Sequence, residues 1–150
     1  MAGVRVTVGH RSRIPGTQIG VQLNVFRLNR LQAGINGDAL MEILMDIARP
    51  SLEQAVIQWP VWTGASRDSI SLDPIEIGPT LARVVLQAGG EKLISDPRNE
   101  SHKDYAPFIE FNGTKTAPPG ILFDAVYGRD TELRQDIHSR VSDLVRSLIA

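Results

Sequence analysis

Histidine is the residue type that most often binds metals or transfers protons near neutral pH, and this chain keeps its histidines far apart. The chain of 150 residues has no cysteine, which excludes a zinc–thiolate site, a disulfide and a cysteine nucleophile. A metal site would have to combine His102 with Asp96, Glu100 or Asp104, and those spacings match no pattern typical of calcium or zinc. His138 stands in an amphipathic segment, where a solvated side chain is expected. We therefore expect no metal ion.

Serine nucleophiles and phosphate-binding loops also lack their usual sequence context. Ser66, Ser69 and Ser71 lie close together in the chain, but none stands in a Gly-x-Ser-x-Gly elbow. There is no Gly-x-Gly-x-x-Gly and no P-loop, and Gly89-Gly90 is typical of a turn. The eight aromatic residues are not interleaved with basic ones, as stacking on single-stranded nucleic acid would require. These observations favour a protein that has no catalytic residue and no cofactor and acts by assembling with other proteins.

The elements that would position a site begin with two extended segments and a long helix. Val4, Val6 and Val8 alternate with polar residues, which predicts a strand with one wet face. Residues 18–28 read as a second extended stretch. Apolar residues at helical spacing then predict a helix over 38–59. Pro50 stands in its middle and should either kink it or begin a new helix there.

Three further strands are predicted in the second half of the chain. They cover residues 70–77, 80–88 and 105–112. Asp73-Pro74 interrupts the first of them, and a proline inside a strand is typical of a sheet edge or a bulge. Residues 91–104 are mostly polar with mixed charges, which indicates a mobile surface loop.

The last part of the chain is predicted to be helical. Residues 121–127 suit a short helix, and apolar residues recur at spacings of three and four from Leu133 to Leu148. The expected fold class is α+β. An antiparallel sheet would pack against one long helix from the N-terminal half and one C-terminal helix, with an N-terminal β-hairpin or arm. The length suits a single domain over 1–150, divided into an extended segment, 1–37, and a helix–sheet–helix core, 38–150.

Charge is unevenly distributed along the chain. Residues 1–37 contain five arginines and no acidic residue, whereas the net charge of the whole chain is −1. Such a basic segment indicates either an arm that meets a negatively charged partner or simply a solvated surface. The start of the chain has no apolar run of signal-peptide length, and no apolar stretch is long enough to cross a bilayer. We expect a protein made in a cytoplasm, with no membrane partner.

Two stretches are more specific than these general patterns. The first runs Trp59-Pro60-Val61-Trp62-Thr63-Gly64-Ala65-Ser66-Arg67-Asp68-Ser69-Ile70. The second runs Tyr105-Ala106-Pro107-Phe108-Ile109-Glu110-Phe111-Asn112-Gly113-Thr114 and continues into Ala117-Pro118-Pro119-Gly120. Their order resembles the tail-completion and neck proteins of tailed bacteriophages, the family related to minor tail protein Z of lambda-like phages. Those proteins run from a helix to Pro-x-x-Thr-Gly-x-x-x-x-Ser-Ile, and later to Tyr-Ala-x-x-x-Glu-x-Gly-Thr before a terminal helix.

The resemblance covers residues 38–150 as an architecture, and its specific motifs occupy only the two stretches. The chain departs from the pattern at Asn112, which is inserted before Gly-Thr, and in residues 89–104, which are longer than expected. The resemblance implies a structural subunit of the head–tail joint, without a cofactor, that forms a ring with itself, most simply a hexamer. Its implied partners are neighbouring neck or connector proteins and tail-tube or terminator proteins, around a channel through which DNA passes. The implied location is the neck or tail of the virion, after assembly in the host cytoplasm.

Two alternatives stay open at this point. One is a tail terminator that caps the tail tube, and the other is a DNA-binding module that uses the basic residues 1–37. For the leading hypothesis, the candidate contact residues come from the basic segment and the two motif stretches. They are Arg5, Arg11, Arg13, Thr63, Gly64, Arg67, Asp68, Ser69, Tyr105, Glu110, Gly113 and Thr114.

Overall fold

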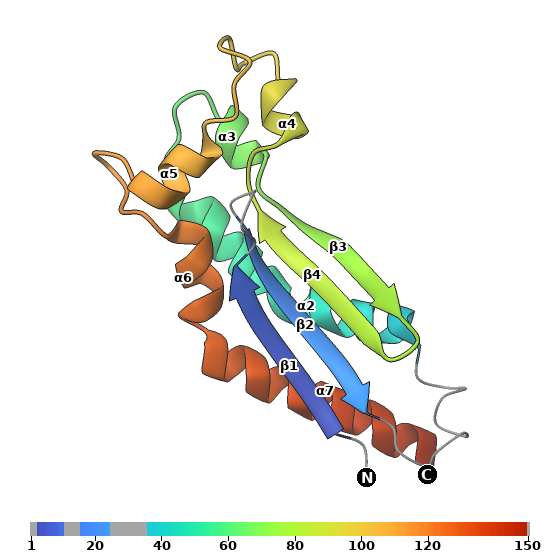
Figure 1. The fold of residues 1–150 in the computed structure, drawn as a ribbon. Coiled ribbons are helices and arrows are strands. Elements are labelled where there is room, and N and C mark those ends of the chain that lie inside the picture. Colours follow the sequence, from blue (N-terminus) through green and yellow to red (C-terminus); the bar gives the residue numbers. More distant parts are fainter. Residues whose placement is uncertain (1–2, 11–15, 25–35, 150) are drawn as a thin grey trace.

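A computed structural model describes residues 3–10, 16–24 and 36–149 of the chain (Figure 1). Its four strands form one antiparallel sheet in the order β1-β2-β4-β3. The strands are β1 (Gly3–His10), β2 (Gly16–Asn24), β3 (Ser71–Gly78) and β4 (Leu81–Gln87). The predicted α+β class with an antiparallel sheet is confirmed. The N-terminal strands belong to the main sheet, because β2 pairs with β4.

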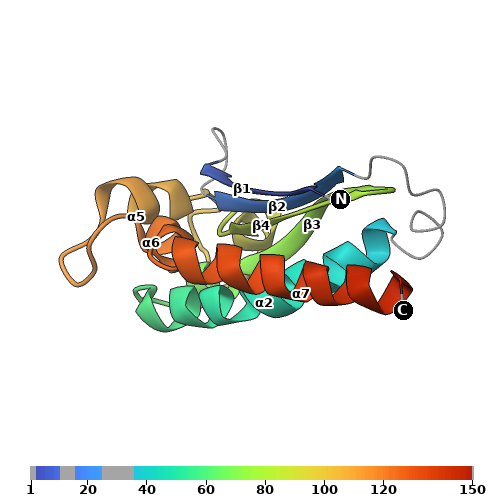
Figure 2. The same cartoon turned by 90° about the horizontal axis from the view of Figure 1, so that it is seen from below.

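Two long helices, α2 (Gly37–Gln58) and α7 (Asp130–Ile149), cover one face of this sheet (Figure 2). The shorter helices α3, α4 and α5 lie beyond one end of the strands, and α6 leads from them to α7 (Figure 1). Their bounds are Ala65–Asp68, Glu91–Ile94, Ala106–Asn112 and Ile121–Tyr127. The molecule is therefore a sheet layer on a helix layer, with a cap of short helices at one end.

Period-two alternation explains which face of the sheet is buried. Every second residue of each central strand points to the helices and is almost fully buried, with the intervening residues on the other face. The inward residues are Ile19, Val21 and Leu23 on β2 and Ala82, Val84 and Leu86 on β4. They pack against Leu40, Leu44 and Ile47 of α2 and Leu133, Ile137 and Val141 of α7. This contiguous apolar core holds the two layers together.

A capping hydrogen bond and a proline explain where helix α2 begins and ends. The Asn36 side chain accepts a hydrogen bond from the backbone N–H of Ala39 at 2.8 Å, which caps the first turn. Asp38 lies in that first turn, as the sequence predicts. The helix stops at Trp59, which precedes Pro60 and has extended backbone angles. Pro50 stays inside one continuous helix, so of the two alternatives that the sequence left open, a new helix beginning at Pro50 is excluded.

Residues 105–112 are the clearest correction to the predicted elements. The sequence suggests a strand there, but Ala106–Asn112 is helix α5. Ala106, Ile109 and Glu110 are its buried residues, and spacings of three and four are helical rather than period-two. Pro107 stands in the first turn, where its missing N–H costs no hydrogen bond. Aromatic and β-branched residues favour strands on average, and the helical period of the buried positions overrides that preference here.

The segment predicted as a mobile loop, 91–104, contains structure of its own. It begins with the short helix α4, whose Leu93 is fully buried. The side-chain amide of Asn99 is also buried and donates hydrogen bonds to the carbonyl oxygens of Leu93 and Lys103, at 2.8 and 2.9 Å. The buried side chains of Leu93 and Asn99 therefore attach this segment to the rest of the protein. The polar composition of the segment indicated neither of these contacts.

Both edge strands of the sheet carry features that interrupt further strand pairing. On β1, the carbonyl oxygen of Val8 accepts a hydrogen bond from the Tyr127 hydroxyl at 3.2 Å, and that of Val6 accepts one from Arg134 at 3.0 Å. On β3, Pro74 has no N–H to donate, and the register shifts between Pro74 and Glu76. The prediction that Asp73-Pro74 marks an edge or a bulge is confirmed, since β3 is an edge strand with an irregular register.

Candidate protein interface

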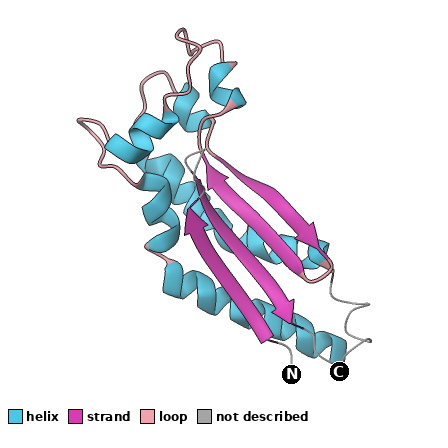
Figure 3. Ribbon diagram, in the orientation of Figure 1, coloured by secondary structure: helices cyan, strands magenta, loops and turns pink. Residues whose placement is uncertain are grey.

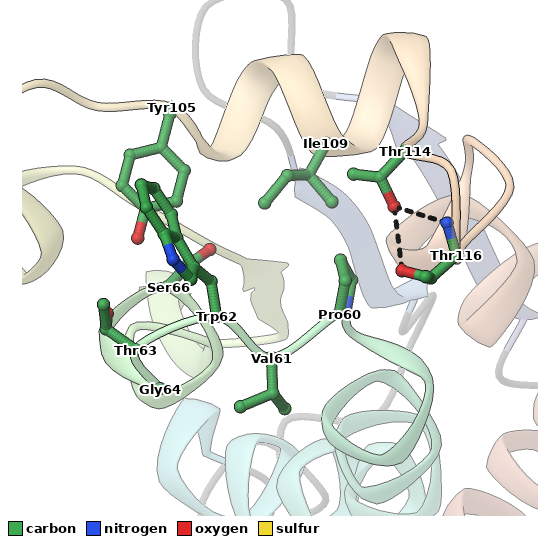
Figure 4. Close-up of a pocket in the computed structure, with 10 residues that line it drawn as sticks. All are labelled: Pro60, Val61, Trp62, Thr63, Gly64, Ser66, Tyr105, Ile109, Thr114 and Thr116. Carbon is green, nitrogen blue, oxygen red and sulfur yellow. Dashed lines mark hydrogen bonds between the residues drawn. The ribbon is translucent and has the colours of Figure 1, made fainter.

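The two motif stretches meet at the capped end of the molecule. Residues 60–66 lie beside helix α5 and the loop that follows it, and together they enclose a pocket of about 310 Å³ (Figure 4). The two stretches lie close to each other through a helix and two loops, and not through the pairing of strands (Figure 3).

Large apolar side chains are exposed around this pocket. Trp62 is 86% exposed, Phe108 71%, Val61 59% and Phe111 58%. The Trp62 and Tyr105 rings face each other at a centroid distance of 6.5 Å and bridge the two stretches (Figure 4). Clustered exposed aromatic residues mark interaction surfaces in soluble proteins. We call Val61, Trp62, Tyr105, Phe108 and Phe111 the aromatic end.

A buried hydrogen-bond network fixes the first stretch below the exposed rings. The buried indole of Trp59 donates to the hydroxyl of Ser66 at 2.7 Å. The Ser69 hydroxyl donates to the carbonyl oxygen of Ser66 and accepts from the backbone N–H of Gly89 at 2.8 Å. Ser66 and Ser69 are therefore buried residues whose hydroxyls take part in the hydrogen bonds that hold this stretch in place.

Asp104 orients the second stretch. Its carboxylate accepts hydrogen bonds from the backbone N–H of Gly90 at 2.9 Å and of Ala106 at 3.2 Å. The second bond lies at the start of α5, where backbone donors have no partner inside the helix. Asp104 thus joins the end of β4 to the start of the helix that carries Phe108 and Phe111.

Glu110 locks the other side of α5 to helix α6. Its side chain is only 2% exposed, and its two oxygens accept hydrogen bonds from the backbone N–H groups of Leu122 and Phe123 at 2.9 and 3.0 Å. The Glu110 carbonyl oxygen also accepts from Gly120 at 2.7 Å. This carboxylate caps the N-terminus of α6, where negative charge is favourable. Its side chain is directed inward, so it does not present the contact surface that the sequence suggested.

The glycines and threonines of the motifs shape the backbone turns of the site. Gly64 and Gly113 have positive φ angles of 86° and 72°, which side-chain-bearing residues rarely adopt. A Cβ at Gly113 would also lie 2.8 Å from the Pro119 nitrogen. Thr114 accepts from the backbone N–H groups of Thr116 and Ala117 at 3.3 and 3.1 Å, and Thr63 accepts from Ala65 at 3.3 Å.

Charged side chains line the flank of the aromatic end. Arg98 bridges Asp96 and Asp68 at 2.7 and 2.9 Å, and Arg67 lies 3.7 Å from Asp68. The Arg98 guanidinium donates to Asp96 through two side-chain nitrogens and lowers the pKa of that carboxyl to about 2. The same hydrogen bonds raise the pKa of Arg98. The side chains of Arg67 and Asp68 are 39% and 50% exposed, whereas Ile70 is buried.

The remaining predicted contact residues lie at the pocket, on the sheet or outside the described residues. Thr63 and Thr114 are exposed at the pocket, where Tyr105 is half-buried. Arg5 is exposed on β1, in the sheet and not in the cap of short helices. Arg11 and Arg13 lie outside the described residues.

Sequence reasoning did not single out the exposed aromatic residues. Trp62, Phe108 and Phe111 stand inside the quoted motifs, but the type of a residue does not by itself show which aromatic side chains are exposed. The signal that could have found Phe108 and Phe111 is their spacing of three next to the buried Ile109 and Glu110. That pattern places them on the outward side of a helix.

Within the described residues, the structure shows neither a metal site nor a membrane span. No three histidine, aspartate or glutamate side chains there are grouped so that they could hold a metal ion. None of the helices in the same part of the chain combines the length and apolarity needed to cross a membrane. Comparison with protein-family models, curated proteins and solved structures found no match to this chain.

Proposed function

We propose that this protein is a structural subunit of the head–tail joint of a tailed bacteriophage, a neck or tail-completion protein that assembles with itself and with neighbouring joint proteins. The proposal starts from the resemblance of the two motif stretches to that family. It implies an assembly role, without a catalytic centre.

One observation supports it above the others. The two stretches that carry the resemblance are separated in sequence by β3, β4 and α4, yet they come together around one apolar pocket. Exposed Trp62 lines that pocket, and exposed Phe108 lies on helix α5, whose Ile109 lines the pocket as well. Both rings would be covered in a protein–protein contact on this side. Large exposed aromatic residues at the centre of an interface supply much of its binding energy.

The same surface does not favour the DNA-binding alternative. Between Ala106 and Gly120 the only charged residues are the buried Glu110 and the exposed Lys115. Phosphate recognition needs clustered basic side chains, and charge-poor aromatic surfaces are typical of protein partners. We therefore assign the aromatic end to contact with a neighbouring protein of the joint.

The test uses particles assembled without this chain, to which purified protein is added back. Wild-type protein should convert separate heads and tails into joined particles, counted by electron microscopy. The double variant Trp62→Ala with Phe108→Ala should keep its fold but join at least about tenfold fewer particles, because a lost aromatic anchor commonly costs 2 kcal/mol or more, roughly thirtyfold in binding.

Ile77→Ala is the matched control, since Ile77 is 53% exposed at the far end of β3. It should join like the wild type. Normal joining by the double variant would exclude the aromatic end as the contact, and infectious particles formed without the chain would reject the proposed function. Tails of irregular length in its absence would favour a tail terminator instead.

A further inference from the structure

The pocket at the aromatic end is uncharged. None of the ten residues that line it carries a charge, and three threonines supply most of its polar side-chain atoms (Figure 4). Its apolar part is formed by Pro60, Val61, Trp62, Tyr105 and Ile109. An ion would lose its hydration in such a pocket without gaining a partner, so the pocket suits a neutral, apolar group.

A second pocket of about 310 Å³ adjoins the first. Trp62, Thr63 and Tyr105 line both pockets, whereas Arg98 and Glu100 line only the second. The Trp62 and Tyr105 rings, at a centroid distance of 6.5 Å, therefore separate an uncharged pocket from a polar one. An extended ligand that crosses this pair of rings can place side chains in both pockets.

The two rings also carry hydrogen-bond donors. The indole N–H of Trp62 and the hydroxyl of Tyr105 make no hydrogen bond with another described residue. The backbone around them is held in place, because Thr63 accepts from Ala65 and Thr114 accepts from two N–H groups of its own loop. Each ring can therefore pack its face against an apolar group while its donor reaches a carbonyl oxygen of the same ligand.

Only one of the common modes of peptide recognition fits this arrangement. Addition of a strand requires an unpaired strand edge, and the lining residues belong to helices and loops. A docked helix requires a continuous apolar groove over two turns, about 11 Å, and the pair of rings divides the surface here. Recognition of acidic motifs requires clustered arginines, which the uncharged pocket lacks. The remaining mode is a polyproline II segment, whose backbone carbonyl oxygens have no internal partner.

We propose that the aromatic end binds a proline-rich segment of a neighbouring protein in the polyproline II conformation. One proline ring packs against Trp62 in the uncharged pocket. A second proline, three residues and about 9 Å further along the segment, reaches the second pocket beyond the rings. The Trp62 indole and the Tyr105 hydroxyl donate to carbonyl oxygens of the segment. This inference rests on the proposed function, which assigns the aromatic end to contact with a neighbouring protein.

A defined peptide tests this inference on the purified protein. The probe is an acetylated and amidated decamer of L-proline, and its binding is followed by the NMR signal of the Trp62 indole N–H. Trp59, the other tryptophan, is buried and donates to Ser66, so its signal should stay in place as a reference. We expect saturable binding. Trp62→Ala, followed by backbone signals, should bind at least about tenfold more weakly, because it removes the packing surface. Tyr105→Phe should bind about threefold more weakly, because it keeps the ring and removes one hydrogen bond.

The matched peptide is the decamer of D-proline, which has the same composition and the opposite helical hand. It should bind at least about tenfold more weakly than the L-peptide. The matched protein variant is Ile77→Ala, at the far end of β3, and it should bind the L-peptide like the wild type. Equal binding of the two peptides would show adhesion to an apolar surface and overturn the inference, as would a lack of saturable binding or an unchanged affinity of Trp62→Ala.

The outcome is separable from that of the joining experiment. Peptide binding by a protein that proves dispensable for joining heads to tails would reject the proposed function and leave the proline site in place. Joining that depends on Trp62, without binding of the L-proline peptide, would reject this inference and leave the proposed function in place.

Discussion

At the scale of single residues, the buried Glu110 carboxylate is the strongest candidate for a large effect on stability. Glu110→Ala leaves the amides of Leu122 and Phe123 without their acceptor in a poorly hydrated site. We expect a loss of about 1–3 kcal/mol in the free energy of unfolding, measured by urea denaturation, because unsatisfied buried donors keep their full desolvation cost.

Trp62→Ala is the control for that measurement, since the ring is 86% exposed. Its unfolding free energy should stay within roughly 0.5 kcal/mol of the wild type, as is usual for surface substitutions. Equal unfolding midpoints for Glu110→Ala and the wild type would show that the carboxylate does not stabilise the α5–α6 junction.

The lowered pKa of Asp96 predicts that the stability of the fold decreases at acidic pH. Hydrogen bonds from Arg98 hold its pKa at about 2, below the ordinary value of 3.8. A lowered folded-state pKa means that the ionised group stabilises the fold above the ordinary value, and that this contribution is lost as the pH falls from about 4 through 2. Arg98→Ala should raise the Asp96 pKa, followed by carboxyl NMR, because it removes the guanidinium hydrogen bonds and keeps the one from the backbone N–H of residue 98. A midpoint that stays near 2 in this variant would mean that the side chain of Arg98 does not lower the pKa.

At the scale of elements, Pro50 is an unusual feature of α2. A proline inside a helix removes one backbone hydrogen bond and crowds the preceding turn. Pro50 is exposed, so Pro50→Ala should restore the bond and improve helix propensity without disturbing the core. Part of that gain is offset, because alanine increases the entropy of the unfolded chain. We expect a net stabilisation of about 1 kcal/mol, visible as a higher melting temperature. A lower melting temperature would indicate that the proline bends α2 into a shape that the core requires.

Sequence reasoning performs best for elements with an unambiguous period. The strands around Val6 and Val84 and the C-terminal helix from Leu133 follow from alternation or helical spacing alone. It fails for 105–112, because eight residues that include three aromatic side chains suit either element. The hydrogen bonds that Asp104 and Glu110 accept from the backbone N–H groups of Gly90 and Leu122 join this segment to distant parts of the chain, so the local sequence does not indicate them. The exposure of Trp62 could not be predicted for a related reason. The residue type indicates only how often tryptophan is buried. In this protein the hydrogen bond between Trp59 and Ser66 belongs to the buried tryptophan, and Trp62 is the exposed one.

At the scale of the whole molecule, the proposed function makes a prediction about the basic segment. Alanine replacements of Arg5, Arg11 and Arg13 should weaken the joining of heads to tails, while the fold stays intact. The reason is that they remove positive charge from residues 1–37, which hold five arginines and no acidic residue. Circular dichroism would check the fold, and particle counts would measure the joining. Unchanged joining by this triple variant would exclude these three arginines from the contacts that join heads to tails.

The edge strands of the sheet bear on whether free copies of such a protein can accumulate before assembly without aggregating. The proposed assembly role requires many free copies to be present at once, and an open edge strand would let them add to one another as a growing cross-β stack. Tyr127 and Arg134 occupy carbonyl oxygens on β1, and Pro74 with its bulge interrupts β3. Neither edge offers an uninterrupted row of backbone partners, so copies are expected to meet through side chains. Contacts of that kind are finite in number and reversible, which keeps a concentrated pool of subunits from being lost to fibrils.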